Sequence, residues 1–277
     1  MNTQTHTSVK PDTALAPQRS GEDQVQVQVQ VQGKHKDQGK DQPEGSAPSL
    51  RSVAGLFVIA CVFALAGGSL DAYTYLTHDH VFSTAESGNV VQFGVYASGG
   101  DWAHAVHFLP PIGAFVLGTA VARLLGAQAK KHTFRATLIC QGLEGTVLFF
   151  LAVFGAGLSG QWIVPLIAFC AALQNTSFSA LGPWTFNNAM TTGNLRHGTS
   201  SAIFWLMGRD REKNRGQAIV SYTVMTCFLL GGLFGGLYTR YDARHALAPG
   251  FVLILAGFAL TWRQRLLLKQ RDRLTGR

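Results

Sequence analysis

Three carboxylates lie inside or beside long apolar segments, where an ionisable side chain is costly and usually has a function. Asp71 ends the first apolar segment, Glu86 lies in the polar turn after it, and Glu144 lies in the middle of a later segment. A carboxylate held away from water can take up and release a proton near neutral pH, as a proton-coupled transporter requires. For Asp71 and Glu144, this role and a purely structural hydrogen-bonding role both stay open. Glu86 is expected to be wetted at the outer face of the membrane.

Two polar turns end in the same way, with Ser87-Gly88-Asn89 in the first half of the chain and Thr192-Gly193-Asn194 in the second. Glycine allows unusual backbone angles in such a turn, and free N–H groups at the start of the following helix attract anionic groups. Small residues can instead serve close helix packing, which we favour for the glycines inside the helices. The candidate substrate- or ion-binding residues are Asp71, Gly88, Asn89, Glu144, Asn175, Gly193, Asn194 and Arg196.

Arg196 is the basic residue that follows the second turn, with His197 beside it. It could pair with a carboxylate from the other half of the chain or hold an anionic substrate. It could equally extend its charged end to the inner membrane surface.

The stretch His78-Asp79-His80, with His104 and His107 further on, has the residue types of a metal site. Three adjacent residues cannot all point at one ion without strain, so we expect a solvated loop and no metal. No HExxH, GxSxG or Walker-type motif occurs, which argues against an enzyme and leaves no catalytic residue or cofactor to assign. The four cysteines lie in apolar segments and are expected to be buried thiols.

The elements that must position these side chains are apolar helices. Only 14% of the 277 residues are charged, against about 25% in a typical soluble domain. Apolar runs of about the 20 residues needed to cross a bilayer occupy 53–73, 105–125, 136–156, 162–181, 217–237 and 247–263. Shorter apolar segments, 88–99 and 190–207, follow the first and fourth runs. We predict an all-α membrane protein with about six transmembrane helices and two short re-entrant or broken helices.

The charges between the runs indicate the orientation. If the short segments do not cross, fourteen Lys and Arg residues outside the N-terminal tail lie on one side of the membrane and two, Arg240 and Arg244, on the other. The positive-inside rule then places both termini in the cytoplasm. Clusters at the ends of apolar runs also argue against a nucleic-acid-binding face, despite the net charge of +8.

The two halves of the chain resemble each other. Asp71 precedes Gly88 by 17 residues, and Asn175 precedes Gly193 by 18. With three crossings in each half, the copies point in opposite directions, which is the inverted 3+3 repeat of many secondary transporters. We expect a disordered cytoplasmic tail (1–50), a membrane domain (51–265, with repeats at about 53–156 and 162–263) and a basic cytoplasmic tail (266–277).

These paired motifs make the chain similar to the YoaK-like family of bacterial inner-membrane proteins. The resemblance rests on Gly68-x-x-Asp71, on Ser87-Gly88-Asn89 and on Thr191-Thr192-Gly193-Asn194, and covers about residues 50–265. Relatives tend to have His-Met-Thr-Gly-Asn at the first turn, so the carboxylate of Glu86 is an addition here. The family implies a small multi-spanning protein of the inner membrane whose biochemical role is not established.

Two functions follow from this pattern. One is a small secondary transporter for an unidentified small solute, coupled to protons, in which the two turns meet near the middle of the bilayer. The other is a non-transporting membrane scaffold or assembly factor, in which the polar turns only pack helices. The transporter hypothesis predicts that Asp71, Asn89 and Asn194 face a shared polar cavity. Its partners are the lipid bilayer and the solute, without nucleic acid, and since six spans make a small transporter a homodimer is a plausible assembly.

Overall fold

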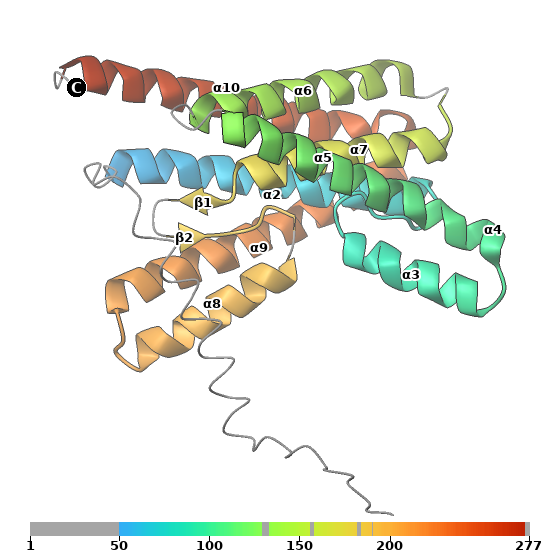
Figure 1. Ribbon diagram of the computed structural model, residues 1–277, viewed down its shortest axis with the longest axis horizontal. Helices are drawn as coiled ribbons and strands as arrows, with labels where there is room; N and C mark the ends of the chain where they lie inside the picture. Colours follow the sequence, from blue (N-terminus) through green and yellow to red (C-terminus); the bar gives the residue numbers. More distant parts are fainter. Residues whose placement is uncertain (1–49, 129–132, 156–157, 182–183, 190, 275–277) are drawn as a thin grey trace, which may run out of the picture. The chain divides into compact units, whose positions relative to one another are not determined.

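The computed structural model describes residues 50–128, 133–155, 158–181, 184–189 and 191–274, most of them helical (Figure 1). The longer helices are α2 (Leu50–Thr77), α5 (Leu109–Gln128), α6 (Thr133–Phe154), α7 (Gly160–Ser177), α9 (Arg211–Tyr241) and α10 (Leu247–Leu274). The shorter ones are α3 (Glu86–Ser98), α4 (Trp102–Ala105), α8 (Thr191–Leu206) and the 3-10 turns η2 (Val106–Phe108) and η4 (Ala243–His245). The predicted N-terminal tail falls almost wholly on residues 1–49, outside this described part.

One small sheet interrupts the helices. Strands β1 (Ala180–Leu181) and β2 (Trp184–Thr185) pair antiparallel, with Ala180 opposite Thr185. The hairpin is fixed to the start of α9, because the Gln217 amide bonds both the N–H and the carbonyl of Thr185, at 3.0 and 2.6 Å.

Five helical segments are long and apolar enough to cross a membrane: Ala54–Thr77, Trp102–Ala127, Arg135–Phe154, Arg211–Tyr241 and Ala243–Gln270. This confirms the predicted all-α membrane fold. The two short predicted segments are α3 and α8, with 13 and 16 residues. At 1.5 Å per residue they extend about 20 and about 24 Å, less than the roughly 30 Å of a hydrocarbon core.

The fourth predicted span, 162–181, coincides with α7, which is not among those five segments. It has 18 residues, contains Pro165 and ends in the polar sequence Gln174-Asn175-Thr176-Ser177. Ten of its eighteen residues are buried, because α5 and α6 pack against it. A helix covered by protein can carry polar residues that lipid would not tolerate, so a crossing by α7 stays a prediction.

Helix α2 is the centre of the bundle. In its apolar segment 56% of the residues are buried, against 22–39% in the other four spans. It packs mainly against α9 and α10, while α7 links α5 to α6 and α8 lies along α9 (Figure 1). The largest apolar cluster joins five helices, through side chains that include Phe63, Leu148, Ile167, Val224 and Ile254.

Glycines allow α2 and α9 to touch through their backbones. A Cβ atom at Gly68 would fall on the carbonyl oxygen of Phe228, and one at Gly231 would fall on the carbonyl oxygen of Leu65. A Cβ at Gly235 would lie 2.6 Å from Ser69 Oγ. Close approach of this kind is a common way to hold membrane helices together, because lipid competes poorly with tight van der Waals contact.

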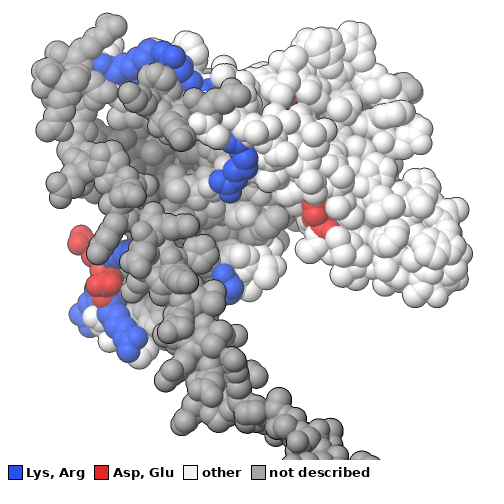
Figure 2. Space-filling view, viewed as in Figure 1, with Lys and Arg blue, Asp and Glu red and all other residues white. Residues whose placement is uncertain are grey.

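The surface divides into a charged end and an apolar body. On the face in Figure 2, Lys and Arg gather where α9 begins and α10 ends, and most of the remaining described surface carries little charge. Large apolar side chains on the spans are exposed, among them Val116, Leu117, Leu229, Phe234 and Val252. Exposed apolar surface of this extent is expected where lipid covers a protein.

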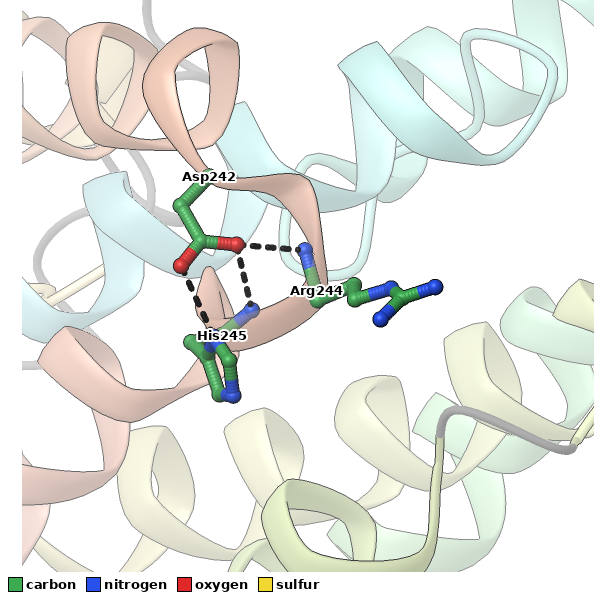
Figure 3. Close-up of polar contacts among 3 residues, drawn as sticks. All are labelled: Asp242, Arg244 and His245. Atoms are coloured by element: carbon green, nitrogen blue, oxygen red, sulfur yellow. Dashed lines mark hydrogen bonds and ion pairs between the residues drawn. The ribbon is translucent and has the colours of Figure 1, made fainter.

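Two surface turns are closed by the same aspartate–histidine cap. Asp242 accepts hydrogen bonds from the N–H groups of Arg244 (3.1 Å) and His245 (3.4 Å), and its other oxygen lies 2.7 Å from His245 Nδ1 (Figure 3). Asp101 binds the N–H and Nδ1 of His104 in the same way, at 3.2 and 2.7 Å. These hydrogen bonds lower the pKa of both aspartates. The guanidinium of Arg244 extends away from the cap (Figure 3).

Candidate functional site

Asp71 fixes the first polar turn to α2. Its Oδ1 accepts hydrogen bonds from Ser83 N (2.9 Å), Ser83 Oγ (3.0 Å) and Thr84 N (2.7 Å), and its Oδ2 accepts from Thr84 Oγ1 (2.6 Å). All three residues are buried. The described residues contain no cation paired with Asp71, so four hydrogen bonds take the place of a counter-charge. This is the geometry of a structural carboxylate.

Asn89 closes the same turn by binding the backbone seven residues earlier. Its Oδ1 accepts from Phe82 N (2.9 Å), and its Nδ2 donates to Phe82 O (2.8 Å) and to Glu86 Oε2 (3.0 Å). Both amide hydrogens and the amide oxygen are thus used inside the turn. A glycine is favoured at position 88 of this turn, because a Cβ there would lie 2.9 Å from the ring of Phe82.

Asn194 binds the second turn through the same atoms. Its Oδ1 accepts from Asn187 N (2.9 Å) and its Nδ2 donates to Asn187 O, again seven residues earlier. Asn175 takes the place of Asp71, since its Oδ1 accepts from Asn188 N (3.2 Å). Gly193 differs from Gly88 in having open space where its Cβ would stand. We call these two units, residues 82–89 and 187–194, the asparagine clamps.

Both asparagine clamps lie against one stretch of α2. The first is tied to Asp71, and the carbonyl oxygen of Asn188 in the second lies 3.8 Å from where a Cβ of Gly67 would stand. Residues four apart on a helix share a face and are about 6 Å apart along its axis. The chain therefore returns twice to the same part of the central helix.

A second polar group lies between α6 and α7. Glu144 is buried, and its Oε1 accepts from Gln174 Nε2 at 3.0 Å. Its Oε2 has no hydrogen-bond partner in the described residues, and neither has either amide atom of Gln141, which is buried one turn earlier. Gln174 precedes Asn175, so the last turn of α7 joins this group to the second clamp. Buried polar atoms without partners need an explanation, such as a bound water, ion or proton.

Glu86 is half-buried at the start of α3 rather than wetted. Its pKa is raised to about 7, because burial and, to a smaller extent, the nearby Asp71 raise it by more than the hydrogen bond from Asn89 lowers it. Its Oε1 is buried without a partner among the described residues. Glu86 is therefore a group that changes its charge near neutral pH, and Thr191 stands at the matching place in the second clamp.

The titration of Glu86 predicts a pH-dependent stability. Between the usual glutamate value of 4.5 and about 7, the folded state holds a proton that the unfolded state has lost. The free energy of unfolding of the wild type should therefore fall as the pH rises through this window. Glu86→Gln should match the wild type at pH 5 and be the more stable protein at pH 8, as measured by melting temperature in detergent. A constant difference between the two proteins from pH 5 to pH 8 would contradict this titration.

The remaining candidates lie apart from these groups. Arg196 is exposed on α8 and makes no ion pair with a described residue. In the expected solvated loop, Asp79 and His80 are exposed but His78 is half-buried. The part of the chain that the structure describes has no group of three or more His, Cys, Asp or Glu placed to hold a metal ion.

Several partners in the site were not among the predicted residues: Ser83, Thr84, Gln141, Gln174, Asn187 and Asn188. Gln141 and Glu144 are three residues apart on one helix, a spacing that places both side chains on the same face and can be recognised in the sequence. The bonds of Ser83 and Thr84 to Asp71 arise from an irregular loop, in which spacing gives no such signal.

Together the apolar helices and the buried polar groups between them indicate a multi-spanning α-helical membrane protein. A family model described as "Protein of unknown function (DUF1275)" matches residues 59–260, and the chain belongs to this family. That match confirms the resemblance to the YoaK-like proteins. No curated protein and no solved structure matches the chain.

Proposed function

We propose that the protein is a small secondary transporter of the bacterial inner membrane, built as an inverted 3+3 repeat in which α7 also spans the membrane and brings the number of spans to six. The observation that carries this proposal is the pair of asparagine clamps, which use the same atoms at the same seven-residue spacing in the two halves. Broken helices at matching places in two repeats form the central site of many transporters.

Helices α3 and α8, which contain the clamp residues Asn89 and Asn194, are also arranged in a way that suits a transporter. In Figure 1, α3 and α8 run toward opposite ends of the bundle. The clamp asparagines Asn89 and Asn194 each lie in the first turn of these helices. A helix start attracts anionic groups, so this arrangement supports an anionic or polar solute near the clamps.

Glu144 is the residue that we assign to proton coupling. Asp71 is satisfied by four donors, whereas Glu144 has one donor and, among the described residues, one unpartnered oxygen; the amide of Gln141, one turn earlier on α6, is also unpartnered. A buried carboxylate with a free oxygen can take up and release a proton, which is what a reversible proton carrier requires.

Transport in proteoliposomes tests the proposal. With a panel of metabolites and an imposed pH gradient, the wild type should accumulate at least one solute, and Glu144→Gln should abolish accumulation driven by the gradient. Glutamine keeps an oxygen for the bond from Gln174 but cannot carry a proton. Asp101→Asn, which changes an exposed cap, is the matched control and should transport normally.

The alternative function is a membrane scaffold or assembly factor. The hydrogen bonds of Asn89 favour this alternative. Its side-chain amide is fully bonded within its own turn, so it has no free group that could bind a solute. A complete panel on which nothing is transported by well-folded protein would select this alternative. If Glu144→Gln transports as well as the wild type, the transporter proposal stands, but another carboxylate must carry the proton.

The orientation is a separate proposal, with both termini cytoplasmic, and rests on the charges near the span ends. Cysteines introduced at Trp102 and Gln128 should be labelled from opposite sides of the membrane, since α4, η2 and α5 lie between them as one span. Labelling of both from the same side would overturn the six-span arrangement.

A further inference from the structure

The turn after α2 has a backbone that its residues rarely adopt. Val81 N donates to His78 O at 3.0 Å, and the two residues between them have φ angles of +49° at Asp79 and +59° at His80. Turns with two such left-handed residues usually contain Asn-Gly or similar pairs. Unfavourable backbone at residues other than glycine is often kept for function, so the turn merits a functional explanation.

A cavity of about 580 Å³ lies beside this turn. It is formed by the end of α2, the start of α5 and the start of α7, and its size is within the range of small-molecule sites. Pro110, Pro111 and Val164 contribute apolar wall, while Gln161 and Ser159 contribute groups that can form hydrogen bonds. A second cavity of about 210 Å³ adjoins it and shares Asp79 and His107.

Asp79 gives the larger cavity its charge. It is the only Asp, Glu, Lys or Arg among the described residues that line this space. It makes no ion pair with a described residue, because the ion pairs found there are those of Asp101 and Asp242. An unpaired carboxylate at the edge of a partly apolar cavity attracts a cation and repels an anion.

His78 is held firmly and does not compensate this charge. Its Nε2 lies 3.2 Å from the hydroxyl of Tyr73, and a Cβ at Gly160 would lie 2.8 Å from its Nδ1, so α7 begins directly against the imidazole. Burial lowers the pKa of His78 against a smaller opposing effect of Asp79, which disfavours a charged ring. The imidazole is therefore placed by its contacts with Tyr73 and α7 and is not a counter-charge for Asp79.

We propose that this cavity binds a small organic monocation, with the ammonium group at Asp79 and the apolar part against Pro110, Pro111 and Val164. A divalent metal does not suit it, since the described residues offer no set of three metal ligands. An anion does not suit it, since no Lys or Arg among the described residues lines the space. The site does not depend on the proposed transport, and it is separate from the clamps and from Glu144.

Binding of n-butylammonium to the full chain in nanodiscs tests the proposal, with n-butanol and butyrate as the neutral and anionic counterparts. We expect saturable binding of the ammonium compound that weakens with ionic strength, and much weaker binding of the other two. Asp79→Asn should lower the affinity by about fivefold to tenfold. Asparagine accepts a left-handed backbone readily, so the turn and the melting temperature should be preserved.

His80→Gly is the matched variant in the same turn. It removes the unfavourable backbone of residue 80 but leaves Asp79 in place, so it should bind n-butylammonium with the wild-type affinity and melt no lower. Butanol binding as tightly as the ammonium compound, an Asp79→Asn variant of unchanged affinity, or no binding to the wild type would each overturn the proposal.

Discussion

An alanine at Gly231 is expected to leave little folded protein, whereas an alanine at the adjacent Gly232 is expected to be tolerated. At Gly231 the new Cβ would fall on the carbonyl oxygen of Leu65, a backbone atom that cannot rotate away. At Gly232 the nearest atom, the carbonyl oxygen of Gly68, is 3.7 Å from the new Cβ, which is ordinary contact. Over-packing costs about 1–3 kcal/mol and occasionally more, and a contact between two backbones belongs at the upper end because the helices must separate.

The yield of monodisperse protein in detergent and its melting temperature measure this difference. Gly68→Ala tests the same contact from the other helix, since its Cβ would fall on the carbonyl oxygen of Phe228. It should behave like Gly231→Ala, and Gly236→Ala, whose nearest atom is 3.8 Å away, should behave like Gly232→Ala. Equal yields from Gly231→Ala and Gly232→Ala would show that α2 and α9 are not in backbone contact.

The sequence predicts the helices well because hydrophobic length is a direct physical requirement of a bilayer. The run predicted at 53–73 is α2 (50–77), and the one predicted at 217–237 is α9 (211–241). Both helices extend beyond the apolar run, because a helix continues into the polar region until a residue ends it. Hydropathy alone is less informative for α7, because a helix surrounded by protein follows different rules from one facing lipid.

The site is predicted less completely, for a reason that lies in its loops. The asparagines of the two turns and the buried Glu144 are visible as polar residues in apolar surroundings. Their partners are not, since Ser83 meets Asp71 through a loop without regular spacing and Asn188 follows the small hairpin at 180–185. Sequence therefore identifies which side chains are costly to bury, and the structure identifies which bonds offset that cost.

Removal of either asparagine clamp is expected to destabilise the protein by about 2 kcal/mol or more, since a partly buried N–H and C=O lose their partners together. Asn89→Ala removes the partners of the Phe82 N–H and C=O, and Asn194→Ala removes those of the Asn187 N–H and C=O. Melting temperature, or chemical unfolding in detergent, measures the effect. Gln92→Ala is the control, because the bond from its amide to His80 O is exposed and its loss should matter little.

Asn194→Asp tests whether the Asn194 amide stabilises its turn through hydrogen bonds or only by filling space. An ionised aspartate still accepts from Asn187 N but brings a negative charge against Asn187 O, where the amide used to donate. A protonated aspartate restores a donor, so the variant should be much less stable than the wild type at pH 8 and should approach it as the pH falls toward 4. A loss of stability that is equal at both pH values would mean that the amide acts only by filling space.

The double variant tests whether the two clamps form one unit. Both turns lie on the 67–71 stretch of α2, through Asn188 beside Gly67 and Ser83 on Asp71. Sites that share a helical turn are expected to couple, so Asn89→Ala combined with Asn194→Ala should differ from the sum of the single effects by about 0.5 kcal/mol or more. Strict additivity would mean that the turns act independently, and it would remove the main physical reason for placing a shared site between them.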